Sequence, residues 1–204
     1  MKTRLEFLYH GEHKICNYKV SDMREDKYLA LLRGINVGGN NIIRMADLKS
    51  CFEAMDFKDV STYIQSGNVI FRSGVKDKAG LTKEIEERLT ETFNYKSRVA
   101  VFSHQQIKKI VSEAPPDFGT ESEKYKYDVL FLIEPLTAGD LMKKVNPRVE
   151  VDRVYAGEST IYFSRLITKA SQSRLTKIIT IPEYKNITIR NWNTTTRLLE
   201  LMDS

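Results

Sequence analysis

One order of secondary-structure elements can be read twice along the 204-residue chain, and this repeat limits the possible folds more than any other feature. Short runs of aliphatic, β-branched and aromatic residues alternate with segments whose apolar residues recur at helical spacing. In the first half we predict strands over 28–32, 60–64, 69–71 and 99–102, and helices over 45–55 and 81–93. In the second half we predict strands over 127–133, 149–155, 160–163 and 186–190, and helices over 137–145 and 171–179. Each half therefore has the order β-α-β-β-α-β, which is the split βαβ arrangement of a ferredoxin-like unit.

The predicted fold class rests on this repeat. It is an α+β protein of two tandem ferredoxin-like (βαββαβ) subdomains with antiparallel sheets and a C-terminal helix. Residues 23–113 are predicted to form the first subdomain, residues 114–125 a linker that contains the breaker APPDFG, and residues 126–204 the second subdomain. Residues 1–22 share no clear pattern with the rest of the chain, so we treat them as an N-terminal extension before Met23.

The most specialised single stretch is Tyr28–Asn41, YLALLRGINVGGNN, where an apolar strand enters a polar loop with three glycines. Backbone N–H groups of such a loop can hold an anion next to the N-terminus of the following helix. The stretch matches neither the GxGxxG nor the P-loop pattern, however. The same residues also fit a β-hairpin that turns at 38–41 between 35–37 and 42–44, and this structural interpretation is slightly favoured.

Two polar segments that are distant in sequence are expected to meet at one end of the first sheet. The first two strands of a ferredoxin-like unit run parallel, and the turn after the second strand returns to the end where the first strand exits. Residues 33–36, RGIN, should therefore lie beside residues 65–68, QSGN. Ligands tend to bind at the carboxyl ends of parallel strands, which makes this rim a candidate site. The alternative, which has equal weight, is that both segments contain only turn residues.

A third segment, Arg190–Thr194 with the sequence RNWNT, joins the last predicted strand to the last helix over 194–202. Arg190 could hold a phosphate group while Trp192 stacks on a base. The favoured alternative is structural: Asn193 or Thr194 caps the helix, and the only tryptophan fills the core or the junction between subdomains. The candidate ligand-binding residues of the three segments are Arg33, Asn36, Gly38, Gly39, Gln65, Ser66, Asn68, Arg190, Asn191, Trp192 and Asn193.

Composition and the scarcity of histidine narrow the chemistry. The net charge of +5 comes from 32 basic and 27 acidic residues, which permits phosphate binding but does not describe a polycation. His104 is the only histidine outside the extension, so a catalytic triad or a zinc site lacks its usual residues. We therefore predict no metal and no cofactor, and assign no catalytic residue. No apolar run could span a membrane, and Cys16 and Cys51 are expected to be reduced thiols in a cytoplasmic protein.

The segments YLALLRGINVGGNN, MADLKSCFEAMDF, STYIQSGNVIF and RNWNTTTRL together resemble the DUF1697 family, which comprises bacterial proteins of uncharacterised function. The resemblance extends over about residues 27–202 and implies the same two-part ferredoxin-like architecture. It implies no activity. Asp56 stands where the family usually has glycine, which affects only the end of a helix.

These residues support three functional hypotheses. The leading one is a binding protein whose rim accepts an anionic ligand, such as a nucleotide or a nucleic-acid phosphate, with Arg33 supplying the charge. The second is a hydrolytic or phosphoryl-transfer enzyme that uses Ser66 or a bound water, with Arg33 and Arg190 as electrostatic stabilisers. The third is a protein interaction module in which the rim and RNWNT form only the junction between subdomains. The sequence identifies no protein partner.

Overall fold

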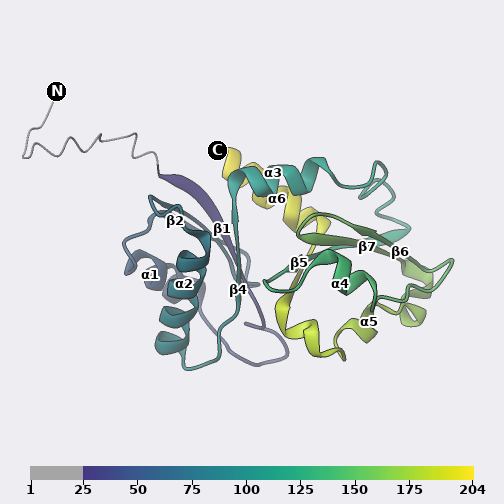
Figure 1. Cartoon of the computed structure of the whole chain (residues 1–204), viewed down its shortest axis with the longest axis horizontal. Helices are drawn as coiled ribbons and strands as arrows, with labels where there is room; N and C mark the ends of the chain where they lie inside the picture. Colours follow the sequence, from purple (N-terminus) through teal and green to yellow (C-terminus); the bar gives the residue numbers. More distant parts are fainter. Residues whose placement is uncertain (1–24) are drawn as a thin grey trace, which may run out of the picture.

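The computed structural model describes residues 25–204, so the predicted extension over 1–22 lies outside the described residues (Figure 1). The first unit consists of β1 (Asp26–Leu32), α1 (Met45–Glu53), β2 (Lys58–Tyr63), β3 (Asn68–Ser73), α2 (Lys78–Phe93) and β4 (Val99–Ser103). The second consists of β5 (Tyr125–Leu132), α4 (Ala138–Met142), β6 (Asp152–Ala156), β7 (Thr160–Leu166), α5 (Leu175–Ile178) and β8 (Ile187–Asn191). Helix α3 (His104–Ser112) comes after the first unit, α6 (Trp192–Asp203) comes after the second, and the 3-10 helices η1 (Ile167–Gln172) and η2 (Pro182–Asn186) flank α5.

Each unit forms its own four-stranded sheet. The strand orders are β2-β3-β1-β4 and β6-β7-β5-β8, and every pair of neighbouring strands is antiparallel. The two sheets have the same topology, as expected for two ferredoxin-like subdomains. Strands β1 and β2 are both antiparallel to β3 and therefore run parallel to each other, which brings their carboxyl ends to the same edge of the sheet.

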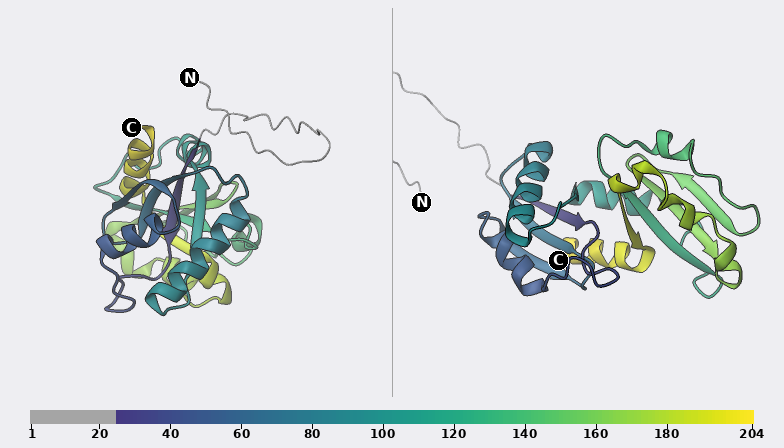
Figure 2. Two further views of the ribbon diagram at one scale, coloured as in Figure 1. Left: turned by 90° about the vertical axis from the view of Figure 1, so that its left-hand side faces the viewer. Right: turned by 90° about the horizontal axis from the view of Figure 1, so that it is seen from below.

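The elements stack in layers, with helices α1 and α2 on the outer face of the first sheet and α4 and α5 on the outer face of the second (Figures 1 and 2). Helices α3 and α6 occupy the middle layer, where their apolar residues pack with side chains from both sheets. Because this middle core draws residues from both subdomains, their burial depends on both sheets being in place.

Strand β1 explains why the chain needs helices on both faces of the first sheet. Its alternate residues Tyr28, Ala30 and Leu32 pack in the core between the first sheet and helices α1 and α2. Leu29 and Leu31 pack in the middle core with helices α3 and α6. Side chains on a strand point alternately to the two faces, so an uninterrupted apolar run is stable only when both faces are covered.

Two of the departures of the second subdomain from the predicted bounds have a clear local cause. Strand β6 begins at Asp152 rather than at residue 149, because Val149 is 84% exposed and Glu150 takes a φ of +68°, which turns the chain out of extended geometry. The helix predicted over 171–179 is divided into η1 and α5, because Ser173 between them has extended backbone angles. Its Oγ accepts a hydrogen bond from Leu175 N at 3.1 Å, a local bond that competes with a continuous helix.

No helix within residues 25–204 combines the length and the apolar character needed to cross a membrane.

Candidate functional site

The predicted meeting of the two polar segments at the end of β1 is confirmed. Leu32 N donates to Gly67 O at 2.8 Å, and the side-chain amide of Asn36 donates to Gln65 O at 2.9 Å. Gly67 is required at this contact because an added Cβ would lie 2.7 Å from Ile35 Cδ1 and 2.8 Å from Leu32 Cβ. The RGIN and QSGN segments therefore form one continuous rim.

The side-chain amides of Asn36 and Asn41 bond to backbone groups of the glycine-containing loop itself. Asn36 Oδ1 accepts from Ile43 N at 2.8 Å, and Asn36 Nδ2 donates to Ile43 O at 3.0 Å. Asn41 Nδ2 donates to Gly34 O at 2.9 Å. The predicted hairpin is reduced to one bridge between Val37 and Asn40, because these amide bonds close the loop before paired strands can form.

The β2–β3 turn is closed in a similar way by Asn68, which is fully buried. Its side-chain amide donates to Tyr63 O and to Ser66 Oγ, both at 2.9 Å. The Ser66 hydroxyl therefore accepts a structural hydrogen bond from an amide. Among the described residues it forms no hydrogen bond with a side chain that could act as a general base.

Arg190 joins this rim to the second subdomain. It is 7% exposed, and its guanidinium donates to Leu32 O at 2.9 Å, Ser66 O at 2.7 Å and Gly67 O at 3.2 Å. It also donates to Asn68 Oδ1, Thr188 Oγ1 and Ile189 O. Burial lowers the pKa of Arg190 to about 10, so the guanidinium stays charged at neutral pH. Its donors are occupied by protein oxygens, which leaves this residue unsuited to clamp a ligand phosphate.

Arg33 crosses the junction in the opposite direction. Its Nε donates to Tyr184 O and Ile187 O, each at 3.1 Å, and its guanidinium stacks on the Tyr184 ring at 4.7 Å from the centroid. The two terminal nitrogens of Arg33 make no hydrogen bond to any residue that the structure describes. Arg98, the neighbour of Arg33 across the β1–β4 pair, donates to Asn186 Oδ1 at 2.9 Å. We call Arg33, Arg98 and Arg190 the arginine seam.

The remaining RNWN residues lie at the start of α6. Asn191 caps the helix because its Oδ1 accepts a hydrogen bond from Thr194 N at 2.7 Å. The predicted caps, Asn193 and Thr194, were therefore placed too late in the chain and lie in the first turn of the helix. Trp192 packs edge-on against Phe118 with ring centroids 5.1 Å apart, inside the middle core. The ring is therefore a packing element, while exposed Asn193 borders a small cleft beside the N-terminus of α6.

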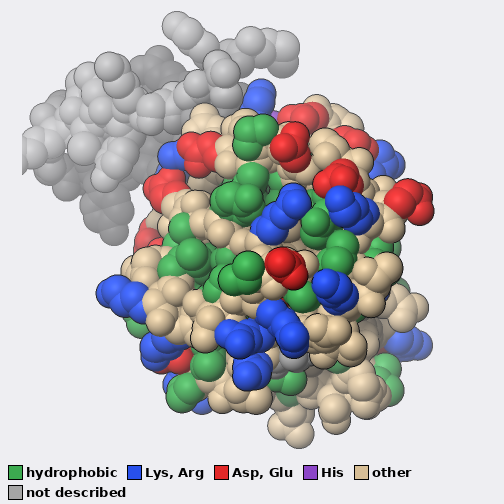
Figure 3. Space-filling model, turned by 90° about the vertical axis from the view of Figure 1, so that its right-hand side faces the viewer, with side chains coloured by type: hydrophobic (Ala, Val, Ile, Leu, Met, Phe, Trp, Pro, Cys, Tyr) green, Lys and Arg blue, Asp and Glu red, His purple; other side chains and the backbone are tan. Residues whose placement is uncertain are grey.

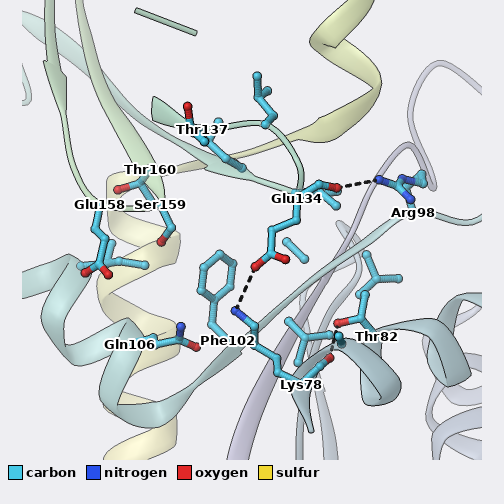
Figure 4. Close-up of a pocket in the computed structure, with 18 of the residues that line it drawn as sticks. Lys78, Thr82, Arg98, Phe102, Gln106, Glu134, Thr137, Glu158, Ser159 and Thr160 are labelled. Carbon is cyan, nitrogen blue, oxygen red and sulfur yellow. Dashed lines mark hydrogen bonds and ion pairs between the residues drawn. The ribbon is translucent and has the colours of Figure 1, made fainter. Parts of the chain in front are cut away.

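Sequence reasoning missed a cleft of about 540 Å³ between the two subdomains, which we call the β4 cleft (Figure 4). Its walls come from α2, from α3, from the segment after β5 and from the start of β7. Figure 4 shows Phe102 at its centre and Glu134 reaching across it toward Lys78. Its apolar lining includes Val101, Phe102, Ile110, Ile133, Leu136 and Tyr162. No local motif marks it, because it exists only once both sheets are placed.

The floor of the β4 cleft is the outer edge of strand β4. Arg33 N donates to Arg98 O at 2.9 Å, and hydrogen-bonded pairs alternate along an antiparallel ladder, so Ala100 and Phe102 bond to β1. The backbone groups of Val99, Val101 and Ser103 then point away from β1.

Two of these three outward N–H groups are satisfied by side chains. Glu86 Oε1 accepts from Val99 N at 2.9 Å, and Gln106 Oε1 accepts from Ser103 N at 2.9 Å as part of a capping box. Val101 N–H and C=O have no partner within residues 25–204. Unpaired groups on a sheet edge are a template for pairing with another chain.

Charges of both signs surround the cleft and pair across it. Lys78 Nζ lies 3.9 Å from Glu134 Oε1, and Lys109 Nζ lies 2.6 Å from Glu158 Oε2. Hydrogen bonding between the last pair raises the pKa of Lys109 and lowers the pKa of Glu158. Lys109, Glu134 and Glu158 are largely exposed and the Lys78 side chain is 37% exposed, so these pairs add little to stability and can exchange partners.

The described residues that could bind a metal or act as nucleophiles are not arranged for either role. Within the described chain no three His, Cys, Asp or Glu side chains gather as a metal site. Burial raises the pKa of the Cys51 thiol, the opposite of what a nucleophilic cysteine needs. His104 Nε2 lies 2.7 Å from Asp203 Oδ1, which ties α3 to the end of α6.

Known proteins share this architecture. A structure described as that of the conserved bacterial protein SP0830 from Streptococcus pneumoniae is similar with a TM-score of 0.78 and 25% sequence identity, over 87% of this chain and 99% of that chain. The search of curated proteins gives no match. The family model described as "Protein of unknown function (DUF1697)" matches residues 26–162. Since that match extends over more than half of the 204 residues, the chain belongs to the DUF1697 family.

Proposed function

We propose that this protein is a cytoplasmic binding module that takes an extended peptide segment into the β4 cleft. The observation that carries the proposal is the unpaired Val101 N–H and C=O, within the described chain, at the floor of the cleft. A donor and an acceptor from one strand residue match the backbone of an added strand, which is the mode known as β-augmentation.

The size and lining of the cleft support the same ligand class. Its volume of about 540 Å³ lies within the range of roughly 300–1,000 Å³ that is common for ligand pockets at domain junctions. The lining is largely apolar around Phe102 and Tyr162, which suits the side chains of an extended peptide. The paired charges at the mouth carry no large excess of either sign, so no strongly charged peptide is required.

The arginine seam contributes rigidity to this proposal. Its bonds connect the rim of the first subdomain to β8 and η2 of the second, and so fix the distance between the two walls of the cleft. A preformed cleft lowers the free-energy cost of binding, because its walls need not be ordered when the peptide binds.

The test compares two substitutions at one residue. Val101→Pro removes the outward N–H, whereas Val101→Ala truncates the same side chain but keeps that N–H, and neither change removes a hydrogen bond to β1. A panel of acetylated, amidated hexapeptides that alternate valine or leucine with serine, lysine or glutamate would be screened by thermal shift. We expect peptides that stabilise the wild type and Val101→Ala but not Val101→Pro. Equal stabilisation of both variants would contradict the proposal.

A nuclear magnetic resonance titration of the wild type covers the case in which Val101→Pro does not fold. Peptide binding should shift the Val101 amide resonance more than that of Ala100, whose N–H faces β1. A peptide that binds without moving the Val101 resonance would place its site elsewhere.

A second candidate function is favoured by Arg33: binding of an anionic ligand, such as a nucleotide or nucleic-acid phosphate, at the rim. The Nε of Arg33 donates to two carbonyl oxygens, which fixes the orientation of the guanidinium. Its two terminal nitrogens form no hydrogen bond with the described residues, and a guanidinium oriented in this way can donate two parallel hydrogen bonds to a phosphate. Gly38, Gly39, Asn36, Gln65 and Ser66 would form its surroundings.

Thermal shift with tripolyphosphate and adenosine triphosphate would test this candidate. Arg33→Ala should abolish the shift, while the control Arg98→Ala, which also removes a seam contact, should retain it. Retention in both variants would exclude Arg33 as the anion-binding group. The hydrolytic alternative has no observation in its favour, because the hydroxyl of Ser66 forms a hydrogen bond only with the amide of Asn68 among the described residues.

A further inference from the structure

A second cleft of about 340 Å³ opens beside the N-terminus of α6, on a different surface from the β4 cleft. It is bordered by the Asn191–Asn193 segment, whose exposed amides have no role in the β4 cleft. Cations, amides and aromatic rings line it together, namely Ser122, Tyr125, Lys126, Tyr127, Asp128, Arg165, Asn191, Trp192 and Asn193.

Basic residues extend from this cleft across the end of the second sheet. Lys126, Arg165 and Asp152 are register partners on β5, β7 and β6, and so form one row across three strands. Strands lie about 4.8 Å apart, so the row spans roughly 10 Å. Asp152 Oδ2 accepts from Arg148 N at 3.0 Å and from Arg174 N at 2.9 Å, which brings two further arginines to the end of the row.

The acidic residues of this region offset only part of its charge. Asp152 is buried, and Asp128 lies 3.2 Å from Arg165. Burial raises the pKa of Asp128, and the charges of Arg165 and Lys126 oppose part of that rise. Lys126 and Arg148 are exposed and form no ion pair with any described residue, while Glu123 and Glu150 are exposed carboxylates near them in the sequence.

Figure 3 views the molecule from the end formed by the second subdomain and shows Lys and Arg side chains gathered over its lower half, with few acidic ones among them. We call Lys126, Arg148, Arg165, Lys169 and Arg174 the basic end. A surface of this kind attracts an extended anion more than a single small one, because its charges are distributed over several strands and loops.

We propose that the basic end binds the phosphate backbone of single-stranded nucleic acid, with a base entering the second cleft. Arginine and lysine neutralise phosphates, and the side-chain amide of Asn193, together with the Nδ2 of Asn191, whose Oδ1 caps α6, can bond to the edges of a base. The combination of spaced cations with an amide- and aromatic-lined cleft favours a nucleic acid over an acidic protein or a lipid surface, which would use the charges alone.

Fluorescence anisotropy of a labelled 15-nucleotide oligothymidine with the full chain tests the proposal. The double variant Lys126→Gln/Arg148→Gln removes two exposed cations that make no ion pair with the described residues. The control Lys49→Gln/Lys83→Gln removes the same charge from helices α1 and α2 of the first subdomain. The slope of log K against the logarithm of the salt concentration is about −0.7 for each phosphate contact on a single strand. Losing two contacts should therefore make this slope less negative by about 1.4.

The control variant should keep the affinity and salt dependence of the wild type. Absence of binding at low salt, equal weakening in both double variants, or equal competition by polyglutamate at the same charge concentration would each overturn the assignment. Because the peptide test addresses strand β4, its result does not affect this one.

Discussion

Replacing Arg190 with methionine should loosen the junction between the two subdomains. The substitution keeps most of the side-chain volume but removes the guanidinium that donates across the junction to Leu32 O, Ser66 O, Gly67 O and Asn68 Oδ1. These four acceptors belong to the first subdomain, so the loss concentrates at the rim.

The expected size depends on which acceptors lose every partner. Gly67 O still accepts from Leu32 N, and Leu32 O still accepts from Thr188 Oγ1 at 3.4 Å. Of the four acceptors in the first subdomain, Ser66 O and Asn68 Oδ1 keep no donor among the described residues. Two unsatisfied groups cost about 2–6 kcal/mol, at about 1–3 kcal/mol each. Part of this is offset because burying a guanidinium is itself unfavourable, so we expect a net loss of about 2–4 kcal/mol.

Urea denaturation of wild type, Arg190→Met, Asn68→Ala and the double variant measures both the loss and its origin. In the double variant the Asn68 acceptor is absent, so the loss of Arg190 no longer leaves it unsatisfied. The destabilisation of the double variant should therefore differ from the sum of the two single destabilisations by roughly 0.5–3 kcal/mol. An Arg190→Met protein as stable as the wild type, or strictly additive effects of the two substitutions, would refute the reasoning.

Three further predictions test individual contacts. Asp56 holds a φ of +59°, so Asp56→Gly should relieve left-handed strain and raise the melting temperature by roughly 2–4 °C, corresponding to about 1 kcal/mol; a lower melting temperature would contradict this. Gly119→Ala should destabilise the fold by about 1–3 kcal/mol and shift the emission of the single tryptophan, because the added Cβ would lie 2.3 Å from Trp192 Cδ1; unchanged emission and stability would show that the indole is not packed there. Burial raises the folded-state pKa of Asp128, so the stability linked to its protonation is complete below its ordinary pKa and is lost as pH rises through the raised value. Asp128→Asn should therefore become more stable relative to the wild type as pH rises from about 4 to 7 in urea titrations, and a relative stability that falls over this range would disprove the burial argument.

Much of the fold could be predicted because its signals are local. Continuous apolarity in β1 indicated a strand buried on both faces, and the turn residues Gly67 and Asn68 indicated the β2–β3 connection. The helix over 171–179 was wrong because one local bond at Ser173 outweighed the helical spacing. The α6 cap was also misplaced, since Asn191, Asn193 and Thr194 are all suitable cap residues.

The candidate sites were less accessible to sequence reasoning because their partners are distant. Arg190 was interpreted as a possible phosphate clamp, but its acceptors in the first subdomain lie more than a hundred residues earlier in the chain, and no local pattern indicates them. The β4 cleft depends on which strand is at the edge of the first sheet and on how the second sheet is placed beside it. The meeting of RGIN and QSGN was predictable because the topology of one subdomain determines it.

Amide hydrogen exchange along β4 tests the central claim most directly, because it reports whether the edge of the strand in the cleft is open. The amides of Ala100 and Phe102 bond to β1, and those of Val99 and Ser103 bond to Glu86 and Gln106. Val101 should therefore exchange markedly faster than its four neighbours in the free protein, and a bound hexapeptide should slow it. Protection of Val101 equal to that of Ala100 in the free protein would contradict an open strand edge.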